Sequence, residues 1–177
     1  MKLVILDRDG TINHDSDHYI KSLDEWRPIK GSIEAIARLT QAGYRVAVAT
    51  NQSGISRGLF TTRTLFEMHD HLQRLSTQAG GRIDAFFFCP HMAEAKCACR
   101  KPEPGMLFEV ARRFNVAMDD VYMVGDALKD VQAAAAAGVR PVLVLTGKGR
   151  KTQDEGKLPP GTQVFPDLAA FAEHLAP

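Results

Sequence analysis

The sequence lacks three features that would assign the protein to a specialised class. Its N-terminal apolar run, residues 3–6, is only four residues long, whereas a membrane helix needs about 20. Three cysteines, an odd number, are too few for a disulfide framework. Charge of one sign is not in excess, since 22 Lys and Arg residues face 21 Asp and Glu residues. A protein built to grip nucleic acid usually has a strong basic excess, so we expect neither nucleic acid nor a membrane as a partner.

The composition that remains is that of an ordinary globular protein. Hydrophobic residues occupy 45% of the 177 positions and charged residues 24%. This length suits a single domain, residues 1–177, whose core needs no disulfides to be stable. We therefore expect a cytoplasmic monomer whose cysteines stay reduced.

Short apolar, β-branched runs alternate along the chain with segments of helical periodicity. The predicted strands are residues 3–6, 44–49, 85–88, 121–124 and 141–145. The predicted helices are residues 32–43, 61–78, 104–114, 127–137 and 167–175. Ser32 is the expected cap of the first helix, and residues 148–161, rich in Lys, Gly and Pro, are expected to form a loop. The alternation predicts a doubly wound, Rossmann-like α/β fold with a mostly parallel sheet.

Polar segments follow the predicted strands, at the sheet edge where such folds place their sites. The first strand is followed by Asp-Arg-Asp-Gly-Thr at residues 7–11, and the second by Thr-Asn-Gln-Ser-Gly at residues 50–54. Gly125 and Asp126 follow the fourth strand, and Lys101 stands shortly before the third predicted helix. Carboxylates this close repel one another, and a divalent cation removes that repulsion. Oxygen ligands with few carboxylates favour Mg²⁺.

Asp7 and Asp9 are two residues apart, so an extended backbone directs both side chains the same way. One carboxylate of such a pair can attack phosphorus while the other donates a proton to the leaving oxygen and then accepts one from water. Thr50 can hydrogen-bond the transferred phosphoryl group, and Lys101 can neutralise its charge. Asp-x-Asp-Gly-Thr alone is more often a capped turn, and a calcium loop would need a Glu where Ser16 stands. The conjunction of these groups at strand ends indicates phosphoryl transfer.

This order of motifs resembles that of haloacid dehalogenase superfamily phosphatases, and the similarity extends over nearly the whole chain. The resemblance implies that Asp7 is the nucleophile, which becomes an aspartyl phosphate, and that Asp9 is the general acid and base. Thr50 and Lys101 are then the other two catalytic residues.

The same resemblance implies a Mg²⁺ ion bound by the Asp7 carboxylate, the Asp9 main-chain carbonyl and Asp126. Asp130, four residues after Asp126, is then a supporting acid. Cap domains in this superfamily are inserted between the motifs, but here the predicted strands and helices occupy those intervals. We therefore expect an open site without a cap domain, with specificity set by short loops.

A second metal site is predicted after the third strand. Four soft ligands, Cys89, His91, Cys97 and Cys99, stand within eleven residues. Three thiolates and one imidazole complete a tetrahedral shell, as in structural zinc sites, and leave no position open for a catalytic water. Three unrelated thiols beside a histidine are the alternative. Zinc would stiffen this short loop, which leads directly to Lys101.

The loops also carry residues that resemble the histidinol-phosphatase-like branch of the superfamily. The predicted substrate-binding residues are Asp17, His18, Tyr19, Asn51, Gln52, Ser53, Arg57 and Arg100. A bisphosphate needs cations outside the catalytic centre to hold its second phosphate, a role that suits Arg57 and Arg100, with Lys148 as a weaker candidate. Ala127 stands where that branch usually has a lysine, so either Lys129 compensates or one phosphate contact is missing.

The resemblance implies a Mg²⁺-dependent phosphatase that removes the 7-phosphate of a heptose 1,7-bisphosphate, on the route to ADP-heptose and the lipopolysaccharide core. Histidinol phosphate is the alternative substrate, but a zwitterionic amine needs an acidic neighbour, and the arginines favour a bisphosphate. A non-enzymatic alternative is a receiver-like phospho-switch. Such a switch usually lacks the Asp-Gly-Thr sequence of residues 9–11 and has no need of zinc.

Overall fold

Six strands form one sheet in the computed structural model, which describes residues 1–177. Their order is β3-β2-β1-β4-β5-β6, and every neighbouring pair is parallel. The strands are β1 (Leu3–Leu6), β2 (Arg45–Asn51), β3 (Ala85–Cys89), β4 (Val121–Gly125), β5 (Arg140–Val144) and β6 (Gln163–Phe165). Strand order reverses at β1, which confirms the predicted doubly wound α/β fold.

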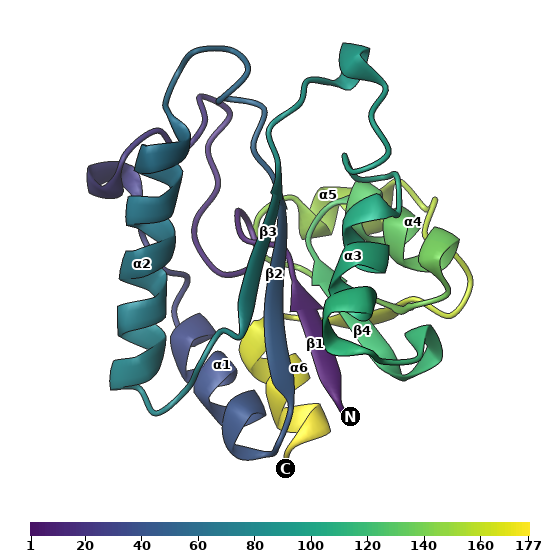
Figure 1. Cartoon of the computed structure of the whole chain (residues 1–177). Coiled ribbons are helices and arrows are strands. Elements are labelled where there is room, and N and C mark those ends of the chain that lie inside the picture. Colours follow the sequence, from purple (N-terminus) through teal and green to yellow (C-terminus); the bar gives the residue numbers. More distant parts are fainter.

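Helices cover both faces of this sheet (Figure 1). The α-helices are α1 (Ser32–Gln41), α2 (Thr62–Gln78), α3 (Gly105–Phe114), α4 (Leu128–Ala137), α5 (Gly149–Asp154) and α6 (Leu168–Leu175). Short 3-10 turns are η1 (Leu23–Glu25), η2 (Ala93–Ala95) and η3 (Met118–Asp120). Apolar residues of α1, α2 and α6 share one core with one face of the sheet, and those of α3 and α4 share a second core with the other face.

The sequence explains where most of these elements begin and end. All four residues of β1 are fully buried, as a strand covered on both faces requires. The Thr61 hydroxyl accepts a hydrogen bond from the amide of Thr64 at the start of α2, and Asp167 caps α6 through the amide of Ala170. Gly138, with a φ of 72°, ends α4 in the left-handed conformation that glycine adopts readily.

Two sequence-based expectations about local structure are wrong. Ser32 does not cap α1, because its hydroxyl donates to the carbonyl of Ile12 at 2.7 Å and Gly31 holds the cap position. The segment 148–161 is not wholly a loop, since it contains α5. Thr152 anchors this short helix by donating to the Asp126 carbonyl at 2.9 Å, a tertiary contact that leaves no periodic signal in the sequence.

The topology brings the carboxyl ends of the strands to one edge of the sheet. Both termini lie near the opposite edge, and the loop that carries η2 rises above the strand ends (Figure 1). No separate cap domain is present, as the sequence predicts. None of the helices has the length and apolar character needed to cross a membrane.

Candidate active site

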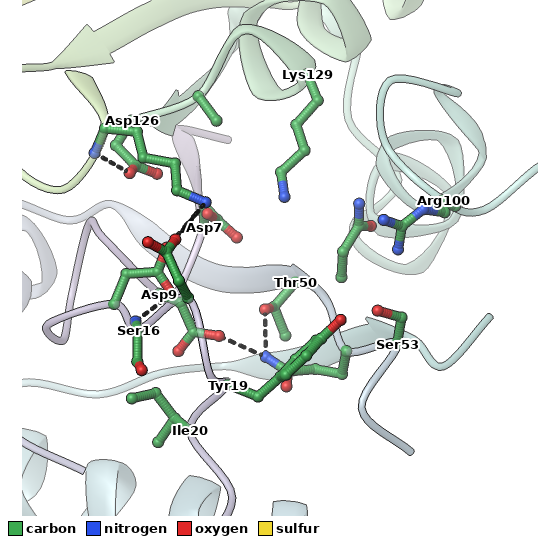
Figure 2. A pocket seen from close by; sticks show the side chains of 16 residues that line it. Asp7, Asp9, Ser16, Tyr19, Ile20, Thr50, Ser53, Arg100, Asp126 and Lys129 are labelled. Atoms are coloured by element: carbon green, nitrogen blue, oxygen red, sulfur yellow. Dashed lines mark hydrogen bonds and ion pairs between the residues drawn. The ribbon is translucent and has the colours of Figure 1, made fainter. Parts of the chain in front are cut away.

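A polar cavity of about 210 Å³ opens at this edge, where β1, β2 and β4 end. Figure 2 shows Asp7 and Asp126 on one side of the cavity and Lys129 and Arg100 on the other. The predicted site residues that line it are Asp7, Asp9, Asp17, Tyr19, Thr50, Asn51, Gln52, Ser53, Arg100 and Asp126. The structure therefore gathers segments that are up to about 120 residues apart in the sequence, as parallel strand ends do.

Lys101 lies beneath the cavity and is fully buried. Its Nζ is 2.8 Å from an Asp7 oxygen, 2.7 Å from an Asp130 oxygen and 2.8 Å from the carbonyl of Ala49. Burial alone would lower the pKa of the amine, but Asp130 and Asp7 outweigh it and raise the pKa above its ordinary value. Lys101 is thus a fixed positive charge that holds two carboxylates in place.

Carboxylate oxygens of Asp7, Asp126 and Asp130 lie within 4.8 Å of one another. Burial and the neighbouring acids raise the pKa of Asp7 to about 6 and that of Asp126 to about 8. Lys101 alone therefore does not balance the cluster. A Cβ atom on Gly10 or Gly147 would fall 2.2 Å from an Asp126 oxygen, so only glycine lets the backbone approach this closely. Hard oxygen donors with excess negative charge in a tight cradle fit Mg²⁺.

Asp9 is held by a separate set of donors. Its Oδ1 accepts from Arg8 Nε at 2.9 Å and from Asn13 Nδ2 at 2.9 Å, and its Oδ2 accepts from Gln52 Nε2 at 2.9 Å. Burial disfavours the charged form, but the Arg8 guanidinium and these hydrogen bonds outweigh it and hold the pKa of Asp9 below its ordinary value. Asp7 and Asp9 thus have opposite electrostatic environments although one residue separates them.

The end of β2, with Gln52 directly after it, connects these groups to one another. Gln52 Nε2 also donates to Thr50 Oγ1 at 2.9 Å, which links Thr50 to Asp9. The Asn51 amide forms a double clamp on the main chain of Lys101: it donates to the carbonyl at 3.0 Å and accepts from the N–H at 3.1 Å. Asn51 and Gln52, expected to bind sugar hydroxyls, therefore also make structural contacts.

Cations border the outer part of the cavity. Arg100, Lys129 and Lys148 all line it, and Lys148 also lies 3.5 Å from a carboxylate oxygen of Asp15. Arg57 is not among the lining residues. Its guanidinium lies exposed, 5.9 Å from the centre of the Tyr19 ring.

The four residues of the expected zinc site are also close together. Cys89, His91, Cys97 and Cys99 each offer one donor atom within 4.8 Å of the others, and the three cysteines are free thiols. Five donor-to-donor separations lie between 3.1 and 3.6 Å. Zinc–sulfur bonds of about 2.3 Å at tetrahedral angles require separations of roughly 3.7 Å, so the cluster matches a zinc shell with little adjustment.

Some residues of the site carried little or no signal in the sequence. Ser16 and Ile20 line the cavity from the loop after β1. Two others, Arg8 and His69, lie behind it in contact with each other. Arg8 offered one clue, because strand alternation directs the residue between Asp7 and Asp9 away from the cavity, where a charge needs a buried partner.

Comparison with known proteins identifies relatives of this chain. A family model of HAD-hydrolase-like proteins matches residues 98–171. The chain is 58% identical over 175 residues to the D-glycero-beta-D-manno-heptose-1,7-bisphosphate 7-phosphatase of Bordetella bronchiseptica, covering 99% of this chain and 98% of the relative. It is 53% identical over 173 residues to the protein of the same name from Pseudomonas aeruginosa, covering 98% and 97% of the two chains.

Solved structures agree with the sequence relatives. The D,D-heptose 1,7-bisphosphate phosphatase of B. bronchiseptica, crystallised with magnesium and phosphate, matches with a TM-score of 0.97 and 58% identity over 99% of this chain and 98% of that one. The corresponding phosphatase of Burkholderia thailandensis matches with a TM-score of 0.77 and 51% identity, over 99% and 98% of the two chains.

Proposed function

Since the chain belongs to the HAD-like hydrolases, in the family of these heptose bisphosphate phosphatases, we propose that it hydrolyses the 7-phosphate of D-glycero-β-D-manno-heptose 1,7-bisphosphate. The observation that carries this proposal is 58% identity along 99% of this chain and 98% of the heptose bisphosphate phosphatase of B. bronchiseptica. Residues 1–177 then act as one catalytic domain in the supply of ADP-heptose for the lipopolysaccharide core.

In the proposed reaction, Asp7 attacks phosphorus and Asp9 protonates the departing sugar oxygen. Asp9 then takes a proton from the water that hydrolyses the aspartyl phosphate, which regenerates both residues. The fixed ammonium of Lys101 supports the ionised form of Asp7 and offsets charge on the transferred phosphoryl group. Thr50, hydrogen-bonded through Gln52 to Asp9, orients a phosphoryl oxygen.

We assign the Mg²⁺ site to the Asp7 carboxylate, the Asp9 main-chain carbonyl and Asp126, with Asp130 as a supporting acid. Bound there, the ion supplies Lewis-acid polarisation of the phosphoryl oxygens. Asp126 is held in place by the N–H of Lys148 at 2.7 Å, and Asp130 by its ion pair with Lys101.

The second phosphate of the substrate is assigned to Arg100 and Lys129, which border the cavity opposite the carboxylates. Lys129 then compensates for the lysine absent at position 127. Ser53, Asp17 and the remaining lining residues are left to contact the sugar hydroxyls, since Arg57 and His18 are exposed and do not line the cavity.

We assign zinc to Cys89, His91, Cys97 and Cys99. The full set of four protein ligands gives the ion a structural task, which is to hold the loop before Lys101. Thiolates of this kind persist in a reducing compartment, which supports a cytoplasmic location.

Phosphate release from three substrates tests the proposal: heptose 1,7-bisphosphate, fructose 1,6-bisphosphate and histidinol phosphate. We expect the largest kcat/KM for the heptose bisphosphate, dependence on Mg²⁺, and release of only one phosphate. A larger kcat/KM for histidinol phosphate would instead select the alternative substrate.

Asp7→Asn should abolish turnover and also the acid-stable label that rapid quenching leaves on the protein. Asp24→Asn, at an exposed carboxylate in η1, is the matched control and should leave turnover unchanged. Stable phosphorylation of the unaltered protein without turnover would indicate a receiver-like switch.

A further inference from the structure

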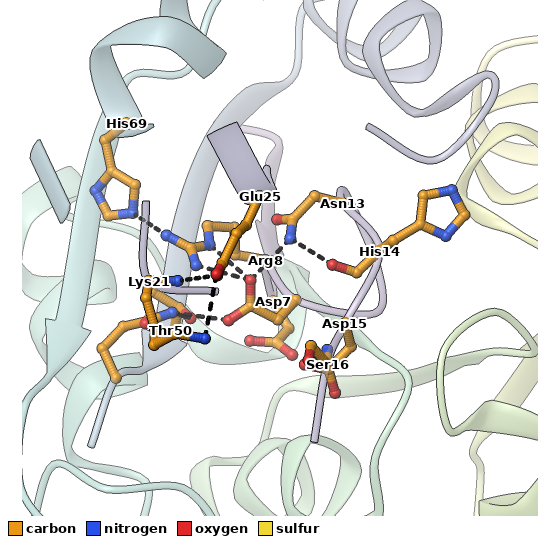
Figure 3. A network of polar contacts seen from close by, with 12 residues as sticks. Asp7, Arg8, Asn13, His14, Asp15, Ser16, Lys21, Glu25, Thr50 and His69 are labelled. Atoms are coloured by element: carbon orange, nitrogen blue, oxygen red, sulfur yellow. Dashed lines mark hydrogen bonds and ion pairs between the residues drawn. The ribbon is translucent and has the colours of Figure 1, made fainter. Parts of the chain in front are cut away.

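We propose that His69 is a positioning residue that fixes Arg8, and through it the carboxylate of Asp9, for proton transfer to the leaving oxygen. This inference rests on the proposed role of Asp9 as general acid and base. His69 lies on α2, 61 residues from Arg8 in the sequence, and never borders the cavity. Figure 3 shows its ring directed at the Arg8 guanidinium.

Arg8 is fully buried and directs two of its nitrogens at one oxygen of Asp9. Its Nε donates to Oδ1 at 2.9 Å, and Asn13 Nδ2 donates to the same oxygen; Nη2 lies 2.8 Å from Oδ1 as an ion-pair contact without a hydrogen bond. Oδ1 is therefore saturated, whereas Oδ2 has a single donor, Gln52. The geometry leaves Oδ2 as the oxygen that can carry the transferable proton.

The third nitrogen of the guanidinium, Nη1, makes its one hydrogen bond to Nε2 of His69, at 3.4 Å. The imidazole is held flat against Phe86, with ring centres 4.5 Å apart and planes inclined by 15°. Its position is therefore set by α2 and β3 rather than by Arg8. His69 is thus a rigidly held hydrogen-bond acceptor for the guanidinium, on an element outside the catalytic loop.

His69 can serve this role only as a neutral acceptor. Burial and the adjacent Arg8 lower the pKa of His69 to about 3, and Asp9 opposes this shift only in part. The imidazole is thus uncharged at neutral pH, so it accepts from Arg8 without repelling the guanidinium from its place against Asp9 Oδ1. Without this acceptor, a second buried guanidinium nitrogen would lack a hydrogen-bond partner, in addition to Nη2, and Arg8 would be freer to move away from Oδ1.

The test compares two substrates to separate a loss of leaving-group protonation from a general loss of activity. A sugar phosphate needs an acid to protonate its alkoxide, whereas 4-nitrophenyl phosphate releases a stable anion without one. The kcat/KM value reports the first chemical step, in which the two substrates differ. His69→Met removes a good acceptor while keeping core volume, and His69→Gln retains an amide oxygen for Arg8.

We expect His69→Met to lower kcat/KM for the sugar bisphosphate about tenfold and for 4-nitrophenyl phosphate less than about threefold, since general acid catalysis contributes roughly 10²–10⁴. His69→Gln should recover most of the loss. His71→Leu, which removes an imidazole from the same helix but one packed against Trp26, is the matched control and should retain wild-type values for both substrates.

Equal losses for both substrates in the Met variant, or no rescue by Gln, would overturn the inference. His69→Leu is a second apolar replacement if the Met variant does not fold. Asp9→Asn identifies where a failure lies. If Asp9→Asn shows the leaving-group dependence and the His69 variants do not, the positioning role fails alone. If Asp9→Asn affects both substrates equally, the proposed role of Asp9 fails.

Discussion

Removal of the Lys101 ammonium should destabilise the protein in a manner that a second substitution reverses. Lys101→Met keeps the aliphatic volume of the side chain but leaves Asp7 and Asp130 buried without their counter-charge. Both carboxylates are almost entirely shielded from water, so solvent cannot replace the lost ion pairs. The variant therefore has uncompensated, buried negative charge at the carboxyl ends of β1 and β4.

The structure sets the size of this effect. Even with Lys101 present, the pKa of Asp7 is raised from 3.8 to about 6, a cost to ionisation of about 3 kcal/mol. Loss of one partner from a buried ion pair typically costs about 3–5 kcal/mol. We expect metal-free Lys101→Met to lose about 4 kcal/mol of unfolding free energy at pH 8. A carboxyl whose pKa is raised on folding binds protons more tightly in the folded chain, so the loss should shrink as pH falls toward 5.

Urea unfolding in EDTA at pH 5, 6.5 and 8 measures this directly. Adding Asp130→Asn to Lys101→Met removes one buried charge and should recover at least about half of the lost free energy, while phosphatase activity stays absent. Lys157→Met, at an exposed lysine, is the control and should change stability by less than about 0.5 kcal/mol. A loss below about 1 kcal/mol for Lys101→Met, or no recovery with Asp130→Asn, would refute this account of the buried cluster.

Three further predictions concern the metals and the second phosphate. The metal-free protein should lose about 2 kcal/mol of unfolding free energy between pH 6 and 8, because folding raises the pKa of Asp126 to about 8. Bound Mg²⁺ should remove this dependence of stability on pH. Equal stability of the metal-free protein at pH 6 and pH 8 would contradict the predicted repulsion among the buried carboxylates. Cys97→Ser should lose zinc, as measured by metal analysis. It should also raise KM for the bisphosphate more than it lowers kcat, because Arg100, the proposed phosphate ligand, donates to the carbonyl of His91 in the same loop at 3.1 Å. Retained zinc would exclude Cys97 as a ligand. Arg100→Ala should raise KM for the bisphosphate about 10- to 100-fold, because one charged hydrogen bond is lost, and should have little effect on KM for a monophosphate. Arg57→Ala should change KM for the bisphosphate less than about twofold. Equal effects of the two substitutions would show that Arg57 also binds the second phosphate.

The fold was largely predictable because buried parallel strands correspond to short, wholly apolar runs in the sequence. The run at residues 3–6 and the four others located β1 to β5 to within about two residues. β6, Gln163–Phe165, carries no such run, because an edge strand of three residues needs only the pairing offered by β5. Its position depends on a neighbour and not on its own residues.

The acids and the lysine of the site were predictable for a related reason. A carboxylate pair directly after a buried strand is costly without function, so Asp7 and Asp9 drew attention in the sequence alone. The contact of Arg8 with His69 was not predictable, since the two side chains meet only after α2 has packed on the sheet. A histidine on the apolar side of a helix was the available clue, and such residues are usually core filling.

Hydrogen bonds of Asn51 and Gln52 connect the Cys/His loop to the active site. Cys89 ends β3, and its carbonyl accepts from the N–H of Gln52 at 2.7 Å. Gln52 reaches Asp9, and its neighbour Asn51 clamps the main chain of Lys101. The Cys/His loop, residues 89–101, thus begins and ends at residues hydrogen-bonded to Gln52 and Asn51. Displacement of this loop would therefore move Lys101 and the donor to Asp9 together, through main-chain and amide hydrogen bonds. The zinc ion proposed for this loop would in this way hold Lys101 and Gln52 in place without contacting the substrate.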